Sequence, residues 1–212
     1  MTNDTADDNQ ARLYLITPAL TESAAFVPIL HAALAAAPVA CVRLNMAVTD
    51  EDLVRRAADQ VREVCHTYDV AMTITDHFRL AAPLGLDGVH LANPRISVRD
   101  VRKELGEDMI VGAFAGVSRH EGMTMAEASA DYVSFGPVGD TALGDGAVAD
   151  NDLFTWWAEM IETPVVAEGG VTLENAPMLA SVADFLCVDG AVWDHPDGPA
   201  EAVKAFAKIL ED

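Results

Sequence analysis

The sequence predicts a single (β/α)8 barrel, and three observations carry that prediction. Short apolar runs alternate with helical patterns eight times along the 212 residues, which is typical of a parallel sheet covered by helices. Several of the runs end in glycine-rich turns, so flexible backbone lies at the carboxyl ends of the strands. The glycine pattern GxGxxG does not follow the first run, which argues against a doubly wound open sheet.

The eight expected strands are apolar runs rich in β-branched and aromatic residues. Pro18 stops the first run, Gly136-Pro137 the sixth, Gly169-Gly170 the seventh and Gly190 the eighth. In chain order the strands are Leu13–Thr17, Val39–Met46, Val70–Thr75, Gly88–Leu91, Met109–Phe114, Ala130–Phe135, Val165–Ala167 and Phe185–Val188.

Helices are expected between these strands. Thr49-Asp50-Glu51-Asp52 is a helix start, with an N-cap followed by acids that suit the positive end of the helix dipole, and Gly106 closes another helix. A short segment with Leu80 and Leu84 links the third and fourth strands. The helices are expected at Thr21–Ala37, Thr49–His66, Ser97–Leu105, Glu121–Ser129, Asp150–Ile161, Thr172–Ala180 and Pro199–Leu210.

The chain length suits one domain with one core. Residues 1–11 are polar and acidic, and we expect a flexible acidic tail followed by a barrel domain over residues 12–212. The start lacks the basic and apolar regions of a signal peptide, and no apolar run reaches the roughly 20 residues that cross a bilayer. Cys41, Cys65 and Cys187 are odd in number and far apart, which favours free thiols in a cytoplasmic protein.

The net charge is −21, from 34 acidic and 13 basic residues. Such a charge argues against nucleic acid as a partner, because phosphates are bound by clusters of Lys and Arg. A phosphate site in this chain must therefore depend on backbone N–H groups more than on cations. The reason for the acidic surface and the oligomeric state, monomer or homo-oligomer, stay open.

Four stretches, in order along nearly the whole chain, resemble the thiamine-phosphate synthase family, which includes the related thiazole tautomerases. They are Leu13-Tyr14-Leu15-Ile16-Thr17-Pro18, Asp87-Gly88-Val89-His90-Leu91, Ala130-Asp131-Tyr132-Val133-Ser134-Phe135-Gly136-Pro137-Val138, and Pro164-Val165-Val166-Ala167 with Gly169-Gly170. The resemblance implies a (β/α)8 barrel, in agreement with the strand pattern.

The resemblance also implies a transferase of thiamine biosynthesis. The family joins hydroxymethylpyrimidine pyrophosphate to a thiazole phosphate and releases pyrophosphate, and Mg²⁺ and cationic side chains stabilise the leaving group. Small phosphorylated substrates are therefore the expected partners. Two alternatives stay open: a thiazole tautomerase, which needs a proton shuttle such as His120 and no Mg²⁺, and a non-catalytic barrel that binds phosphorylated ligands.

Site residues are carried over from the family position by position. By this resemblance Arg43 and His90 are catalytic, Asp76 binds the metal, and Thr141 binds phosphate. Two structural alternatives stay open: Asp76 as a cap of the following helix, and His90 as a buried core histidine with its hydrogen bonds satisfied. The two glycine-rich turns, with Gly169, Gly170, Asp189 and Gly190, match the phosphate-binding turns of the family. Glycine in those turns lets backbone N–H groups approach phosphate oxygens.

Several positions depart from the family pattern. Arg95 lies near the place of a metal-binding Asp, so we expect its guanidinium to act on the pyrophosphate directly, as a third catalytic residue. Asn45 stands where the family has a Lys, and the segment Gly139–Asp150 has no lysine. That long Gly- and Asp-rich segment is a candidate lid. These departures predict either weak synthase activity with little dependence on Mg²⁺, or no synthase activity.

Overall fold

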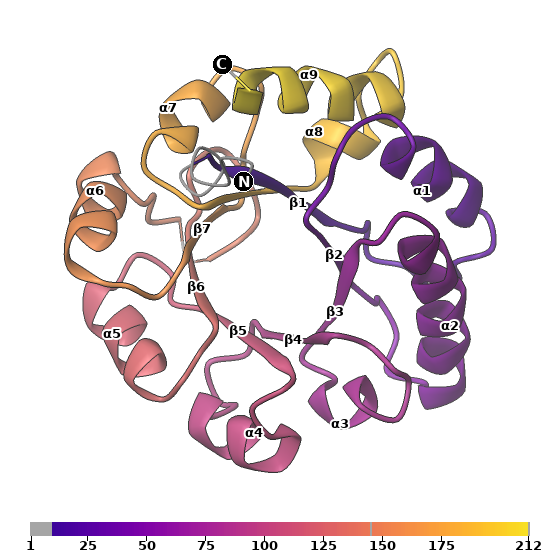
Figure 1. The fold of residues 1–212 in the computed structure, drawn as a ribbon, viewed down its shortest axis with the longest axis horizontal. Helices are drawn as coiled ribbons and strands as arrows, with labels where there is room; N and C mark the ends of the chain where they lie inside the picture. The colour runs from indigo at the N-terminus through magenta and orange to yellow at the C-terminus, as the bar shows by residue number, and fades with distance from the viewer. Residues whose placement is uncertain (1–9, 145, 212) are drawn as a thin grey trace, which may run out of the picture.

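The computed structural model of the chain describes residues 10–144 and 146–211. Within them, parallel strands close into an eight-stranded barrel in chain order, with β8 beside β1 (Figure 1). This confirms the predicted fold class. The strands are β1 (Arg12–Ile16), β2 (Cys41–Leu44), β3 (Ala71–Thr75), β4 (Gly88–Leu91), β5 (Ile110–Phe114), β6 (Tyr132–Phe135), β7 (Val165–Glu168) and β8 (Phe185–Val188).

Helices surround the barrel, and the last one, α9, lies between α7 and α1 (Figure 1). Residues 1–9, most of the expected acidic tail, lie outside the described residues. The helices are α1 (Val27–Leu34), α2 (Glu51–Thr67), α3 (Phe78–Ala81), α4 (Val98–Leu105), α5 (Arg119–Glu127), α6 (Asn151–Met160), α7 (Ala176–Ala180), α8 (Gly190–Trp193) and α9 (Pro199–Glu211).

Local capping explains where the helices begin. Asp50, Ser97, Ser118 and Asp150 each accept a hydrogen bond from the backbone N–H three residues later, which satisfies a donor that the first turn leaves free. Gly106 ends α4 with φ +83°, a conformation that glycine adopts without strain.

Two helices are shorter than the sequence predicts. Helix α1 begins at Val27 and not at Thr21, because Pro28 lies in its first turn, where a missing N–H costs nothing. Helix α7 begins at Ala176 and not at Thr172. There Thr172 and Asn175 exchange side-chain to backbone hydrogen bonds that hold a turn before the helix.

The apolar residues form two clusters, one between the strands and the helices and one inside the barrel. The interior cluster is small and contains Tyr14, Cys41, Tyr132, Val166 and Cys187. Polar groups occupy the rest of the interior, because Thr73 and His90 are also fully buried. The barrel interior is therefore packed with both apolar and polar side chains, and it opens toward the carboxyl ends of its strands.

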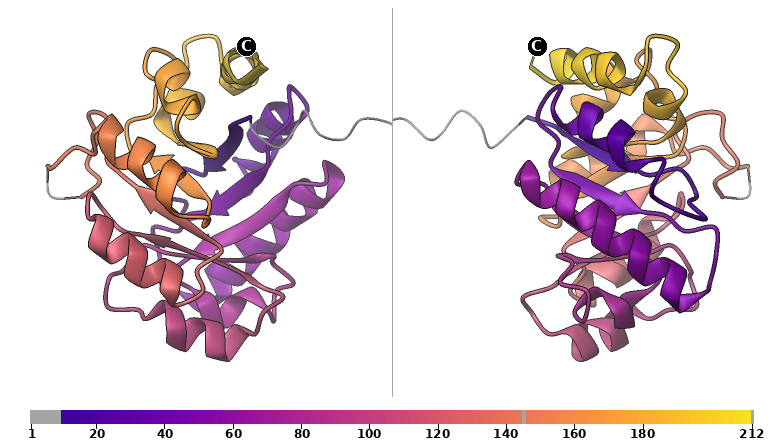
Figure 2. Two further views of the ribbon diagram at one scale, coloured as in Figure 1. Left: turned by 60° about the vertical axis from the view of Figure 1, so that its left-hand side comes forward. Right: turned by 90° about the vertical axis from the view of Figure 1, so that its right-hand side faces the viewer.

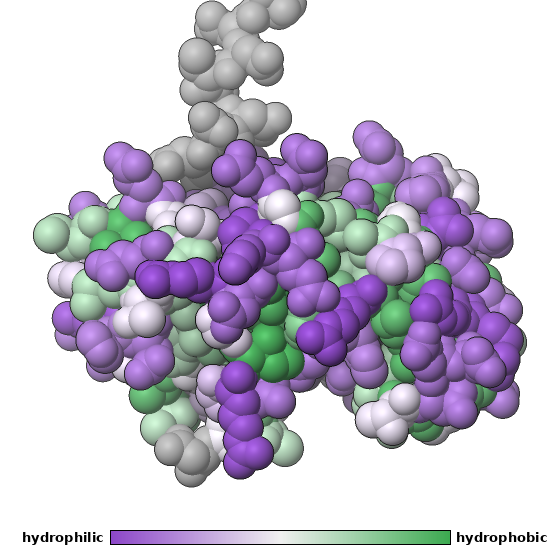
Figure 3. Space-filling view, turned by 90° about the horizontal axis from the view of Figure 1, so that it is seen from below, coloured by the Kyte–Doolittle hydropathy of each residue, from purple (hydrophilic) through white to green (hydrophobic). Residues whose placement is uncertain are grey.

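The outer face that carries α3 and α4, at the bottom of Figure 1, presents mainly hydrophilic side chains (Figure 3). No described helix is long and apolar enough to cross a membrane. The segment between β6 and α6, drawn in pink and orange, projects from the body of the barrel (Figure 2).

Candidate active site

A pocket of about 430 Å³ opens at the carboxyl ends of β1, β2, β7 and β8, the end of the barrel where (β/α)8 enzymes build their sites. The β6–α6 segment also contributes to it, through Thr141, Ala142 and Leu143. A larger hollow of about 780 Å³ lies at the opposite end, around the starts of β1, β7 and β8. Position and chemistry favour the smaller pocket as the active site.

An ion pair between Arg43 and Glu168 forms the floor of this pocket. Arg43 Nη2 donates to Glu168 Oε1, and Nη1 donates to Oε2 over 3.3 Å, so the pair is bidentate. The guanidinium carbon also lies 5.8 Å from the ring centre of Tyr14, within the range of a cation–π contact. Both charged side chains are 5% exposed or less.

Their proximity keeps both groups charged in spite of burial. Burial alone would raise the pKa of Glu168, but the Arg43 guanidinium outweighs it and brings the pKa down to about 2. Burial alone would lower the pKa of Arg43, and Glu168 raises it well above its usual value. Arg43 and Glu168 therefore form an ion pair that carries no net charge at neutral pH.

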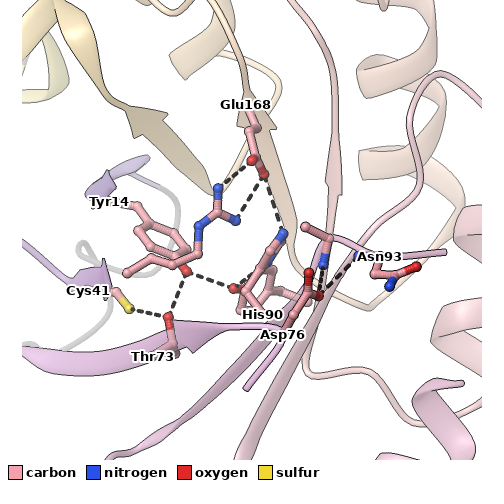
Figure 4. A network of polar contacts seen from close by, with 10 residues as sticks. Tyr14, Cys41, Thr73, Asp76, His90, Asn93 and Glu168 are labelled. Atoms are coloured by element: carbon pink, nitrogen blue, oxygen red, sulfur yellow. Dashed lines mark hydrogen bonds and ion pairs between the residues drawn. The ribbon is translucent and has the colours of Figure 1, made fainter. Parts of the chain in front are cut away.

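His90 is tied to the wall of the barrel by a chain of buried hydroxyl groups. His90 Nδ1 lies 2.9 Å from the Tyr132 hydroxyl, which lies 2.8 Å from the Tyr14 hydroxyl, which lies 3.0 Å from Thr73 Oγ1. Figure 4 shows the side chains of Tyr14, Thr73 and His90 converging on the barrel interior below Glu168. Gly112 leaves space for the Tyr132 ring, because a Cβ at position 112 would come within 1.9 Å of that ring.

The environment of His90 fixes its charge and its tautomer. Burial and then the nearby Arg43 lower the pKa of His90 to about 3, so the ring is neutral. Its Nε2 lies 3.7 Å from Glu168 Oε2. A proton on Nε2 faces that carboxylate favourably, whereas a lone pair would be repelled by it. His90 therefore carries its proton on Nε2 and accepts from Tyr132 at Nδ1.

We call Arg43, Glu168, His90, Tyr132, Tyr14 and Thr73 the floor cluster. Two of its buried nitrogen atoms, Arg43 Nε and His90 Nε2, have no hydrogen-bond partner within the described part of the chain. Buried N–H groups are rarely left unpaired in proteins, and unpaired ones are found at functional sites. The floor cluster therefore holds spare donors beside the Glu168 carboxylate.

The rim of the pocket contains four of the residues that the resemblance assigns to phosphate: Thr141, Gly169, Asp189 and Gly190. Gly169 has φ +79°, and a Cβ there would come within 2.7 Å of Leu143 Cδ2, so glycine is needed beneath the β6–α6 segment. Gly170 packs against Gly139 and does not line the pocket.

Asp194 joins the rim beside Gly190. With Glu168 and Asp189 it brings three carboxylates to a pocket that one guanidinium lines. An anionic ligand would be repelled by these carboxylates, so its binding depends on strong donors at the rim.

Asp76 and Arg95 lie apart from the pocket lining. Asp76 has φ +59°, and its Oδ1 accepts from the backbone N–H groups of Ala92 and Asn93, so it holds the β4–α4 loop in place (Figure 4). Arg95, in the same loop, is exposed.

These residues do not fit the magnesium site that the resemblance implies. One oxygen of Asp76 is already engaged, and the place of the second acid is held by a cation. Among residues 10–144 and 146–211, no three His, Cys, Asp or Glu side chains are grouped so that they could hold a metal ion. Mg²⁺ prefers several oxygen ligands in octahedral geometry, and one half-engaged carboxylate does not provide them.

His120, the candidate for a tautomerase proton shuttle, lies at the start of α5, next to the N-cap residue Ser118. His120 is exposed, and Ser118 caps the helix by accepting from the backbone N–H of Glu121. Neither residue lines the pocket.

Glu168 is the residue that the sequence analysis missed. It is a lone acid at the end of the apolar run Val165–Ala167, as Arg43 is a lone base within another buried strand. Two opposite charges at matching strand ends would have indicated the ion pair. Tyr14 and Tyr132 were noticed only as parts of motifs, because their partners lie on other strands.

Comparisons with known proteins agree with the family resemblance and with the fold. Residues 13–192 match the protein family described as "Thiamine monophosphate synthase". A thiamine-phosphate synthase of Rhodospirillum centenum is 44% identical over 201 residues, which cover 94% of this chain and 97% of that protein. One of Hyphomonas neptunium is 38% identical and covers 100% of this chain and 99% of its own.

Among solved structures, thiamine phosphate pyrophosphorylase from Pyrococcus furiosus has a similar fold. It superposes with a TM-score of 0.83 at 24% identity, over 96% of this chain and 97% of the other. At that identity the likeness supports the fold alone.

Proposed function

This chain belongs to the thiamine monophosphate synthase family, and on that premise we propose that it is a transferase that makes thiamine phosphate. It would join hydroxymethylpyrimidine pyrophosphate to a thiazole phosphate with release of pyrophosphate. The observation that carries the proposal is the convergence of Arg43 with Thr141, Gly169, Asp189 and Gly190 on one pocket. Strand-end positions far apart in the sequence meet there, at the end where barrels bind phosphates.

The floor and the rim suit different parts of the reaction. Pyrophosphate departs with the bonding electrons of its C–O bond, so negative charge grows on the leaving oxygen while the pyrimidine becomes cationic. Donors at the rim would stabilise the leaving group, and an exposed Arg95 can add a positive charge from solvent. The Arg43–Glu168 ion pair at the floor has no net charge, so it would not repel the cationic ring. The thiazole nitrogen then captures the cation.

Members of this family use Mg²⁺, but this chain lacks the second acid of that metal site. Arg95 in its place supports a leaving group stabilised by a guanidinium. His90 does not act as an acid in this scheme, because its pKa of about 3 keeps it neutral at physiological pH.

The test is steady-state turnover of the purified protein with both substrates, with and without EDTA. We expect thiamine phosphate and pyrophosphate in equal amounts, and little loss of rate with EDTA. Binding of the substrates without turnover would favour a non-catalytic barrel. Isomerisation of the thiazole phosphate in the absence of the pyrimidine would favour the tautomerase. Rapid turnover that EDTA abolishes would show that other acids bind the metal.

A further inference from the structure

We propose that Glu168 determines substrate specificity by accepting a hydrogen bond from the amino group of an aminopyrimidine ring. The inference rests on the proposed function and assigns the ring end of that substrate to the floor of the pocket. Its physical basis is the fixed carboxylate of Glu168, together with the spare Nε–H of Arg43, which lines the same pocket.

The Oε2 atom of Glu168 is free to accept a further hydrogen bond. Arg43 Nη2 occupies Oε1, while Oε2 receives the longer 3.3 Å contact from Nη1 and faces His90 Nε2 at 3.7 Å. The buried Ser134 hydroxyl is a further hydrogen-bond neighbour of this carboxylate. A carboxylate offers about four lone-pair positions, so Oε2 has acceptor capacity left. Glu168 lines the pocket, and the capacity is open to a ligand there.

Buried N–H groups near Glu168 supply hydrogen-bond donors beside this acceptor. Arg43 Nε and His90 Nε2 are buried N–H groups without partners in the described chain. An aminopyrimidine edge offers an amino donor next to a ring nitrogen acceptor. Of these two residues only Arg43 lines the pocket, so its Nε–H is the donor that a ring nitrogen can meet beside the carboxylate. A pocket of about 430 Å³ accepts a ring of this size.

Stability alone gives no reason for the ion pair. A buried pair can often be replaced by apolar residues of similar volume without loss of stability. The apolar neighbours Ile16 and Val166 show that the interior accepts such side chains. The pair also does not serve as a bare phosphate site, because Glu168 neutralises Arg43.

The test measures binding of the pyrimidine alcohol, which lacks phosphate, and of an analogue with a carbonyl oxygen in place of the amino group. Titration calorimetry should show that the wild-type protein prefers the amino compound by about 10- to 100-fold, the range of one hydrogen bond to a charged group. Glu168→Gln should lose most of this preference, because an amide can also donate to the carbonyl analogue. KM for the pyrimidine pyrophosphate should rise by a similar factor, and KM for the thiazole phosphate should stay within about twofold.

Glu51→Gln is the matched control, because it removes a carboxylate from an exposed Arg–Glu pair on α2 and should leave both affinities unchanged. If Glu168→Gln fails to fold, the double variant Arg43→Met/Glu168→Leu replaces the ion pair by apolar side chains and should fold but lose affinity for the pyrimidine.

Equal wild-type affinity for the two compounds, or an unchanged preference in Glu168→Gln, would overturn the inference while leaving the proposed function intact. A wild-type protein that neither binds the pyrimidine nor turns it over would overturn the proposed function, and the inference with it.

Discussion

The floor and the rim of the pocket differ in how their polar groups are held. At the floor, Arg43 and Glu168 are buried and pair with each other across the barrel. Asp194 and Thr141 at the rim, and Arg95 in the β4–α4 loop, are exposed to solvent. Low dielectric strengthens every interaction at the floor and penalises every unpaired charge there, whereas water screens the rim. A substitution at the floor should therefore affect folding and binding together, and one at the rim should affect activity alone.

The largest effect is expected from Glu168→Ala. It leaves the Arg43 guanidinium buried without a counter-charge, and we expect a loss of about 3–5 kcal/mol in the free energy of unfolding. Denaturant titration measures it. The double variant Arg43→Met/Glu168→Leu, which removes both charges, should be within about 1 kcal/mol of wild type or more stable. A double variant as unstable as the single one would show that the pair itself stabilises the fold.

Arg95→Ala should produce the opposite pattern. Its side chain is exposed, so the free energy of unfolding should change by less than about 0.5 kcal/mol. If it stabilises the departing pyrophosphate, kcat should fall about 10²-fold with little change in KM. Arg99→Ala, in helix α4 and also exposed, is the control for loss of a surface cation. Equal activity of the two variants would exclude a role for Arg95.

Tyr132→Phe tests the hydroxyl chain within the floor cluster. The change leaves His90 Nδ1 and the Tyr14 hydroxyl without their shared partner, and we expect a loss of about 1–3 kcal/mol. The nitrogen NMR shifts of His90 should also move away from those of a pure Nε2–H tautomer. Phe135→Leu, a buried change that does not touch the chain of hydroxyl groups, should alter stability without altering those shifts. An unchanged tautomer in Tyr132→Phe would show that Glu168 alone fixes it.

The pH dependence of stability should come from the floor as well. His90 has a pKa of about 3 in the folded protein and 6.5 as its ordinary value, so the unfolded chain binds the proton first as pH falls. Its contribution is complete above about pH 6.5 and is lost as the pH falls toward 3, by about 1 kcal/mol per pH unit. The free energy of unfolding of wild type minus that of His90→Gln should therefore decrease from pH 7 to pH 5. If the free energies of unfolding of wild type and His90→Gln changed with pH in the same way, the low pKa assigned to His90 would be wrong.

The difference between floor and rim also explains which parts of the fold and the site could be predicted from the sequence. Strand alternation predicted the barrel, and local capping patterns predicted the starts of α2 and α4 at Asp50 and Ser97. Gly169 and Gly190 were placed at the rim because turns are local features. Glu168 and Arg43 are 125 residues apart, and nothing local records that they meet. The interior of a barrel is assembled from partners on separate strands, so single-strand patterns do not reveal it.

The central claim, that the floor binds the pyrimidine ring and the rim binds the phosphates, is tested most directly by a crystal structure with hydroxymethylpyrimidine pyrophosphate. We expect the amino nitrogen of the ring within hydrogen-bond distance of Glu168 Oε2. The phosphates should lie against Thr141, Gly169 and Gly190. A ring at the rim with phosphate on Arg43, or a Glu168 carboxylate with no contact to the ligand, would contradict the account.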